Sequence, residues 1–288
     1  TSSAMLSYEA FDLVNNRAAY PKQLEYVDTW QPKRLFFNTS WWFYGSEEAF
    51  EKADKGNLSS VDVGVFFPMK GESNTEIAAR SRSQHKSQGF GSEGSRGSSM
   101  EYVELLKGNQ PTEAENLFAG INTSWTRVKG GAPIGKLVQS IEDNFSYENP
   151  AASVPQLVEA YRMIKALPEG YWRSVKLKEV KQLIEAASGL YLEAVANDYS
   201  ATPGQEIEVE LEMTKRLPVE AKLHRITMLP MQTDTVVDMV LEDNANNALW
   251  RKVQLPDDLS YTNPYWLNEE AELGMYTVKD QQMRGLPE

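Results

Sequence analysis

The sequence predicts an α/β protein whose character changes along the chain: an alternating α/β section over residues 1–110, a helical segment over 111–197, and a β-sandwich-like module over 198–288. Three observations predict this order. Short apolar runs alternate with helical patterns in the first section, apolar residues recur at helical spacing in the second, and a strict two-residue alternation opens the third. A chain of 288 residues is long enough for about two or three domains.

The first section begins with a helical pattern over residues 2–15, for which Thr1, Ser2 or Ser3 is a candidate cap. The other elements predicted here are a buried strand over 34–38, a helix over 46–53 capped by Ser46, a strand over 61–67 that Pro68 ends, and a helix over 74–88 that Gly89 closes. These two strands are too few to close an α/β domain, so the remaining strands are expected upstream of Thr1.

The helical segment has apolar residues at helical spacing over 134–145 and 154–167. Pro155 lies in the first turn of the second helix, where its missing N–H is tolerated. The longest helix is predicted from about Lys176 to Asn197. The polar, glycine- and proline-containing stretch 198–204 ends it and marks the clearest boundary in the chain.

In the third section, residues 206–213 alternate glutamate with apolar residues, which is the pattern of a strand with one buried face. The glutamate row predicts a solvated sheet face, because parallel carboxylates lack the convergence that calcium requires. Strand-like runs over 221–228, 233–241 and 249–255 follow, separated by proline or asparagine clusters. A small sandwich is the predicted architecture.

Composition excludes several classes of function. The formal net charge is −12, and residues 198–288 hold 8 basic and 17 acidic residues, a net of −9. No segment clusters Lys and Arg, so nucleic acid is excluded as a partner and an anionic membrane surface is disfavoured. No run of about 18 apolar residues predicts a transmembrane helix. Cysteine is absent, which excludes disulfides and thiolate metal sites.

The chain has two histidines, and His85 is the candidate for a functional role. On a helix over 74–88, His85 and Gln88 share a polar face with Ser81. That face either lines a pocket or holds a capping or hydrogen-bonded structural histidine. His224 falls in a strand-like run and is interpreted as structural. No H-x-x-H motif occurs, and no set of histidines suits a zinc site.

Two further features are candidates for ligand contact. Residues 89–97 hold four glycines, whose backbone N–H groups can approach an anion, and Arg96 can add a bidentate contact; the alternative is a flexible loop over a pocket. Trp41 and Trp42 follow the strand over 34–38, at the end where open α/β sheets bind ligands. They suit a sugar face or, equally, an aromatic core cluster. No catalytic triad or distinctive carboxylate pair can be assembled.

Residues 34–44 (RLFFNTSWWFY) and 83–91 (SQHKSQGFG) resemble the PIG-L (LmbE-like) deacetylase family, in particular its long multidomain members from Bacteroidetes-type bacteria. Residues 191–197 and 263–267 are also similar to those proteins. The resemblance implies a Rossmann-like three-layer α/β domain and a secreted or periplasmic, zinc-dependent hydrolase that removes acetyl groups from N-acetylglucosamine-type substrates. It implies zinc held by an A-H-P-D-D motif and an H-x-x-H motif, with one Asp as general base.

Neither motif is present in this chain, and Thr1–Ala4 resembles the segment that follows the H-x-x-H. We therefore expect a fragment of the catalytic domain that lacks its N-terminal half, binds no zinc by itself and is inactive alone. Its expected partner is an N-acetylated sugar or glycoconjugate. The alternatives are a carbohydrate-binding module that uses exposed aromatic residues and a structural module of a multidomain protein. The candidate pocket residues are His85, Gln88, Arg96, Trp41 and Trp42, and Trp125 and Trp266 belong to the carbohydrate-binding alternative.

Overall fold

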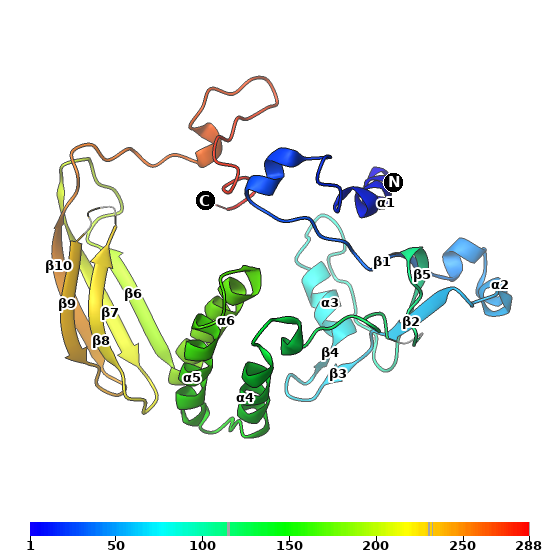
Figure 1. The fold of residues 1–288 in the computed structure, drawn as a ribbon, viewed down its shortest axis with the longest axis horizontal. Helices are drawn as coiled ribbons and strands as arrows, with labels where there is room; N and C mark the ends of the chain where they lie inside the picture. Colours follow the sequence, from blue (N-terminus) through cyan, green and yellow to red (C-terminus); the bar gives the residue numbers. More distant parts are fainter. Residues whose placement is uncertain (114–115, 230, 232, 288) are drawn as a thin grey trace. The chain divides into compact units, whose positions relative to one another are not determined.

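A computed structural model of the chain describes residues 1–113, 116–229, 231 and 233–287. The chain divides into two compact units, Thr1–Ile121 and Asn122–Glu288 (Figure 1). The described part is mixed α/β, with helices and antiparallel strand pairs. Residue 110, the first predicted boundary, lies inside unit 1. Residues 111–121 of the predicted helical segment also belong to unit 1, whereas the rest of that segment and the predicted β module lie together in unit 2.

Unit 1 contains two helices whose N-caps, Thr1 and Ser46, are among those that the sequence predicts. The backbone N–H of Ala4 donates to Thr1 Oγ1 (3.4 Å), and that of Ala49 donates to Ser46 Oγ (3.1 Å). The elements of this unit are α1 Ser2–Leu13, η1 Pro21–Glu25, β1 Arg34–Thr39, η2 Trp41–Tyr44, α2 Glu47–Lys52, β2 Leu58–Asp62, β3 Phe66–Phe67, β4 Glu72–Ser73, α3 Asn74–Arg82 and β5 Met100–Gly108.

Two predicted elements of unit 1 are wrong in extent. The strand expected over 61–67 is divided into β2 and β3, because the Asp62 carboxylate accepts the backbone N–H of Gly64 (2.8 Å) and turns the chain there. The helix expected over 74–88 ends at Arg82, so Gly89 does not close it. Its continuation is rich in serine and other polar residues, which bond the local backbone in turns and offer no apolar stripe to pack.

The sheet of unit 1 has the order β1-β5-β2, and both pairings are antiparallel. Its central strand, β5, was not predicted from the sequence. Tyr102 of β5 stacks edge-on against Phe50 of α2, with ring centroids 5.0 Å apart. Arg34 of β1 holds the chain that follows β5, because its guanidinium donates to the carbonyls of Leu117 (3.1 Å) and Ala119 (2.6 Å).

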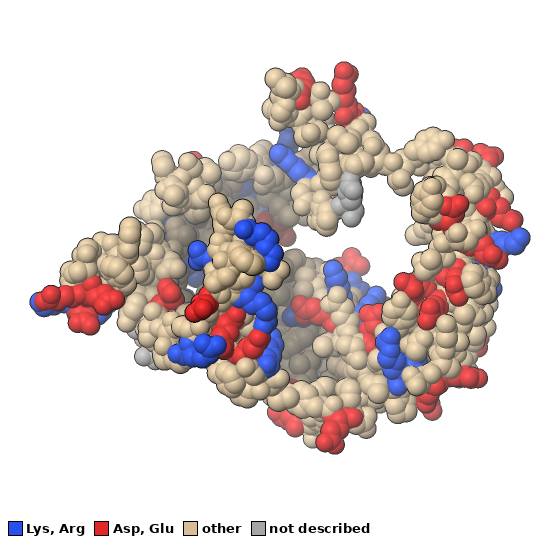
Figure 2. Space-filling view, turned by 180° about the vertical axis from the view of Figure 1, so that it is seen from behind, with Lys and Arg blue, Asp and Glu red and all other residues tan. Residues whose placement is uncertain are grey.

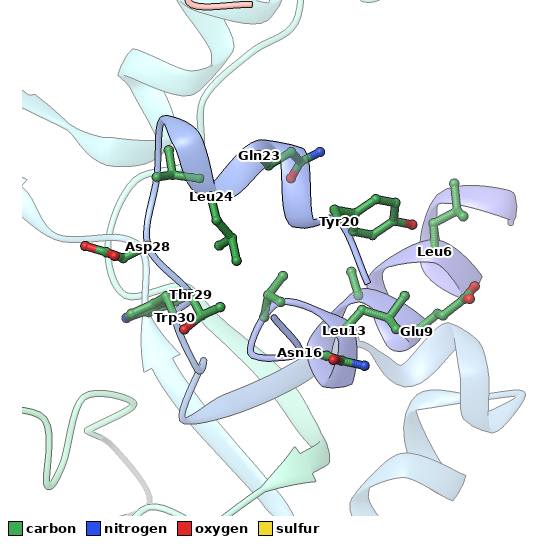
Figure 3. A pocket seen from close by; sticks show the side chains of 13 residues that line it. Leu6, Glu9, Leu13, Asn16, Tyr20, Gln23, Leu24, Asp28, Thr29 and Trp30 are labelled. Atoms are coloured by element: carbon green, nitrogen blue, oxygen red, sulfur yellow. The ribbon is translucent and has the colours of Figure 1, made fainter. Parts of the chain in front are cut away.

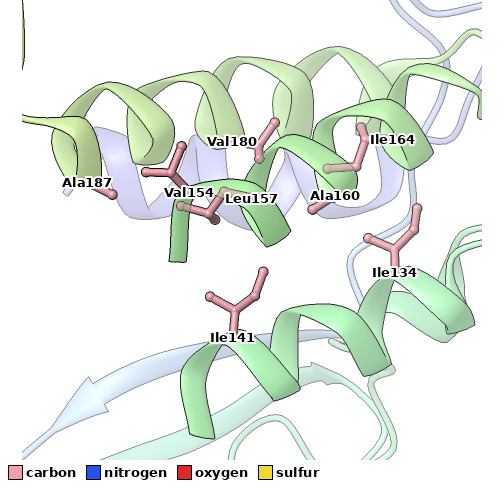
Figure 4. Packing of buried hydrophobic residues seen from close by; sticks show 8 residues of the cluster. All are labelled: Ile134, Ile141, Val154, Leu157, Ala160, Ile164, Val180 and Ala187. Carbon is pink, nitrogen blue, oxygen red and sulfur yellow. The ribbon is translucent and has the colours of Figure 1, made fainter. Parts of the chain in front are cut away.

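The first part of unit 2 is a helical layer whose apolar stripes meet in one cluster (Figure 4). Ile134 and Ile164 are 1% and 2% exposed, and α5 packs against both α4 and α6. Pro155 lies in the first turn of α5, as predicted. The elements are η3 Trp125–Arg127, α4 Ala132–Asp143, η4 Pro150–Ser153, α5 Val154–Lys165 and α6 Tyr171–Ser188.

The helix predicted over 176–197 is wrong at its end, because residues 190–196 form a strand. Gly189 ends α6 in the left-handed conformation (φ +58°), and its N–H donates to the carbonyl of Ala186 (3.1 Å). The strands of unit 2 are β6 Leu190–Ala196, β7 Glu206–Lys215, β8 Lys222–Met228, β9 Thr233–Val240 and β10 Asn246–Gln254, followed by η5 Tyr265–Leu267.

These strands form a three-stranded sheet of order β10-β7-β6 and a separate β8-β9 hairpin. The four predicted strands therefore correspond to β7, β8, β9 and β10. Lys215, at the end of β7, is buried and forms an ion pair with Asp243. Among the described helices, none is long and apolar enough to cross a membrane.

Candidate functional site

The segment that carries His85 starts from a helix with a well-formed N-terminus. Ser73 and Glu76 make a capping box at α3: the backbone N–H of Glu76 donates to Ser73 Oγ (3.3 Å), and the N–H of Ser73 donates to Glu76 Oε2 (3.0 Å). The backbone and hydroxyl hydrogen bonds from Ser73 lower the pKa of the Glu76 carboxyl. The start of α3 is therefore a rigid base for the residues that follow.

The glycine-rich segment (residues 89–97) returns to this base. The hydroxyl of Thr75 donates to the carbonyl of Ser95, and a Cβ on Gly94 would lie 2.5 Å from the Cα of Glu76. Arg96 forms an ion pair with Glu76, with Nε 3.1 Å from Oε1. Only glycine allows this close approach at position 94. The glycine-rich segment thus lies along α3, and Arg96 already has a carboxylate partner.

Asp62 anchors the chain just beyond the glycine-rich segment. Its Oδ1 accepts the backbone N–H groups of Ser99 (2.9 Å) and Gly64 (2.8 Å), and these bonds lower the pKa of the Asp62 carboxyl. A Cβ on Gly64 would lie 2.0 Å from the carbonyl oxygen of Gly97, so the two chain segments are in direct contact. Residues 94–97 of the glycine-rich segment are consequently held by contacts with the start of α3 and with the chain that follows β2.

His85 and Gln88 lie in the turns between α3 and the glycine-rich segment, and not on a helical face. The backbone N–H of His85 donates to the carbonyl of Arg82 (3.0 Å), and that of Gln88 donates to the carbonyl of His85 (3.0 Å). Both side chains are exposed. The predicted stripe shared with Ser81 is therefore wrong, because the helix ends before it reaches His85.

Trp41 and Trp42 form η2 directly after β1, at the predicted end of that strand. They are 43% and 74% exposed, whereas Phe43 stacks against Phe37 of β1 with ring centroids 4.9 Å apart. Among the described residues, no hydrogen bond, ion pair or aromatic contact joins either tryptophan to His85. The sequence thus places Trp41 and Trp42 correctly after β1, but it misplaces His85 and Gln88 on a helix, and these contacts do not join the tryptophans to His85.

Sequence reasoning missed a groove of about 470 Å³ between α1 and η1 (Figure 3). Its lining is mainly apolar and includes Leu6 and Leu13 from α1 and Leu24 from η1, whose side chain points into the space between the two elements. The backbone N–H of Trp30 donates to the carbonyl of Val14 (3.3 Å) and holds the far side. The exposed apolar residues of α1 are the sequence signal that indicates such a groove.

Charged groups elsewhere in the described part of the chain form no metal centre. Over the described ranges, no three His, Asp or Glu side chains are arranged to hold a metal ion. His224, the second histidine, is exposed on β8 and lies 2.6 Å from the Asp238 carboxylate, measured from Nδ1 to Oδ1. The hydrogen bonds from His224 and Lys222 lower the pKa of Asp238. This cluster orders the β8-β9 hairpin.

The chain matches no family model, no curated protein and no solved structure. Its function must accordingly be argued from its own residues and their geometry.

Proposed function

We propose that this chain is part of a zinc-dependent PIG-L-type de-N-acetylase that acts on N-acetylglucosamine-type substrates. Residues 1–110 would then belong to the distal part of a Rossmann-like catalytic domain, and the protein would be secreted or periplasmic. The observation that carries the proposal is the SQHKSQGFG motif over 83–91, with His85 at its centre. The family resemblance of this motif is the reason for naming a deacetylase.

The surroundings of His85 support a binding role for the motif. The side chains of His85 and Gln88 are exposed, while the local backbone is held by hydrogen bonds from the N–H of His85 to the carbonyl of Arg82 and from the N–H of Gln88 to the carbonyl of His85. An exposed imidazole on a held backbone can donate a hydrogen bond to a sugar hydroxyl or acetamido oxygen. Arg96 is paired with the Glu76 carboxylate. It would therefore act mainly by holding the conformation of the glycine-rich segment.

The described residues do not fit a complete zinc site, because they hold no group of three His, Asp or Glu side chains in the required arrangement. We assign no step of hydrolysis to this chain. Under the proposal, the zinc ligands and general base lie in a segment outside these 288 residues. Zinc would activate the attacking water there, while His85 would position the substrate.

The proposal predicts that the chain alone releases no acetate from N-acetylglucosamine or N,N′-diacetylchitobiose. When it is joined to the segment of its reading frame that carries the zinc motifs, acetate release should appear. Zinc-stimulated release by the 288-residue chain would contradict the proposed division of the site. Absence of both zinc motifs from the reading frame would overturn the deacetylase proposal itself.

In the joined enzyme, His85→Ala should leave zinc content nearly unchanged and lower kcat by about 100-fold or less, as expected of a supporting residue. Arg96→Ala should mainly raise KM, because it loosens the segment that carries substrate contacts. Lys178→Ala, at an exposed lysine of α6 outside the motif, is the control. Zinc stoichiometry and steady-state kinetics measure all three. Loss of zinc in the His85 variant, or kinetics equal to those of the unsubstituted enzyme, would remove His85 from the proposed pocket.

A second candidate function, carbohydrate binding without catalysis, is favoured by the exposure of Trp42 (74%). Trp125 packs against the helical cluster and Trp266 stacks on Tyr265, so Trp42 offers the freer ring. Titration of the chain with chitooligosaccharides, followed by tryptophan fluorescence, tests this function. Two results together would favour carbohydrate binding without catalysis. The chain would bind the oligosaccharide saturably and lose this binding in Trp42→Ala, and it would gain no activity when joined to the segment that carries the zinc motifs.

A further inference from the structure

β6 is an edge strand with one side open. In the β10-β7-β6 sheet, β6 pairs with β7 and with no other strand in the described part of the chain. The backbone N–H of Asn197 donates to the carbonyl of Glu208 (2.8 Å), and that of Arg216 donates to the carbonyl of Gly189 (3.1 Å). Both bonds continue the β6·β7 register, in which Leu190 pairs with Lys215.

These two bonds identify which backbone groups face outward. In an antiparallel pair, alternate residues bond the partner strand and the residues between them point away. Gly189 and Asn197 bond toward β7, so the odd-numbered residues between them do so too. The N–H and C=O groups of the even-numbered residues therefore face the open edge; these residues are Leu190, Leu192, Ala194 and Ala196.

β6 has few of the features by which proteins protect such an edge, because Glu193 is its only charged residue. Residues 190–196 contain no Lys, Arg or Pro, and their pairing with β7 runs without a bulge. Leu192 and Val195 are 54% and 48% exposed. The opposite edge strand, β10, carries Arg251 and Lys252. Of the two edges of this sheet, β6 is thus the one suited to accept another strand.

The charge beside this edge indicates which kind of strand can bind there. Glu193 lies opposite Glu212 of β7, and Val195 lies opposite Glu210, so carboxylates cluster on one face next to the open edge. A hydrogen bond from its side chain to Glu193, burial and the neighbouring carboxylates raise the pKa of Tyr191. Figure 2 shows acidic side chains spread over the surface of unit 2. A strand with basic residues on this face would relieve the repulsion.

A second copy of the chain is a poorer occupant. Glu193 is the central residue of β6, so full antiparallel pairing of two β6 strands would place it opposite its own copy. Like charges directly opposite each other destabilise a strand pair. Each copy also contributes the net charge of −9 of residues 198–288.

We propose that the open edge of β6 binds an extended segment of a partner protein in which Lys or Arg alternates with apolar residues. The segment adds a fourth strand to the β10-β7-β6 sheet: its backbone bonds the outward groups of Leu192 and Ala194, and its basic side chains lie beside Glu193. This is strand addition, in which main-chain bonds supply affinity and alternate side chains supply specificity. It does not depend on the proposed deacetylase function.

The test uses the full 288-residue chain and a fluorescently labelled peptide of alternating lysine and valine. A peptide of the same composition, with all lysines before all valines, controls for general attraction to an acidic protein. The alternating peptide should bind with an affinity that falls as salt rises, and should slow hydrogen exchange at the amides of Leu192 and Ala194. Equal binding of the block peptide, or unchanged exchange at those amides, would overturn the proposal.

Variants of β6 sharpen the test. Leu192→Pro removes an outward N–H that β7 does not use, and Leu192→Lys adds a charge at the edge; each should weaken peptide binding about tenfold or more. Leu183→Lys, at an equally exposed leucine (55%) on α6, is the matched control and should bind normally. Glu193→Lys should shift preference to an alternating glutamate–valine peptide. A dimer that Leu192→Pro abolishes would show a second copy to be the occupant and would contradict the basic partner.

Discussion

Unit 1 and the helical layer of unit 2 are stabilised in different ways. In the helical layer, eight buried apolar residues from α4, α5 and α6 meet in one cluster. In the described part of unit 1, the buried apolar side chains are those of Phe50, Leu58, Pro111 and Ala119, and the buried polar residues are Thr39, Ser59 and Ser73. Unit 1 therefore depends more on directed hydrogen bonds, such as those of Arg34, Ser73 and Asp62, than on a large apolar core.

The first α-helix of each region illustrates the difference. α1 has no buried residue, and its Met5 and Leu6 are 74% and 64% exposed. α4 buries Ile134 and Ile141 against the helices that follow it. Apolar burial responds to loss of volume, whereas a hydrogen-bonded unit responds to loss of a donor, an acceptor or a charge. Each region should accordingly be sensitive to a different class of substitution.

The largest effect is expected in the helical layer. Ile164→Ala should lower the free energy of unfolding of this region by about 2–5 kcal/mol, because the side chain is 2% exposed and its removal leaves a cavity. Leu183→Ala, at a side chain that is 55% exposed, is the control and should cost much less. Urea unfolding followed by helical circular dichroism measures both. Equal effects would show that the cluster is not the source of stability.

A smaller effect is expected from the capping box of α3. Ser73→Ala should destabilise α3 by about 1 kcal/mol, because it removes the side-chain acceptor at the helix start. Hydrogen exchange should quicken in α3 and also in the glycine-rich segment, which bonds the same turn through Thr75. Ser73→Thr keeps the hydroxyl and should retain slow exchange. Faster exchange confined to α3 would mean that the glycine-rich segment is held independently.

The next effect is a dependence on pH at Asp62. The pKa of this carboxyl is lower in the folded protein than its ordinary value of about 3.9. Its contribution to stability is hence complete above that value and is lost as pH falls through the folded pKa. Asp62→Asn should remove this part of the acid sensitivity of unit 1. Unfolding curves between about pH 5 and pH 2 measure it, and identical acid profiles for both proteins would contradict it.

The smallest effect is expected at an exposed ion pair of α2. Lys52 lies one turn after Glu48, and both side chains are more than 70% exposed. Lys52→Ala should lower stability by at most about 0.5 kcal/mol, because solvent and salt screen such pairs. Salt titration of the unsubstituted protein and the variant provides the check. A loss of stability comparable to that of Ser73→Ala would contradict the expectation that solvent and salt weaken this ion pair.

Local chemistry made several elements predictable from the sequence. Thr1 and Ser46 are N-caps because each is followed by helix-forming residues whose free N–H groups need an acceptor. The alternation over 206–213 predicts β7 because a period of two is that of a strand. The stripes of α4 and α5 likewise predict their buried faces. In the candidate site, the capping box at Ser73 follows from the local sequence, whereas His85 lies in a turn beyond the end of α3 and not on the predicted helix.

Pairing between distant segments decided the rest. Residues 190–196 continue a helical pattern, but they form β6 because Gly189 turns the chain and β7 offers a partner strand. Tyr102 lies in β5 because the backbone there bonds to both β1 and β2. The contact between Arg96 and Glu76 depends on the close approach that Gly94 permits. Caps, turns and periodic patterns depend on residues that are close in the sequence, so they can be predicted from it. Strand pairing and the partners of charged side chains depend on segments that only the tertiary structure brings together.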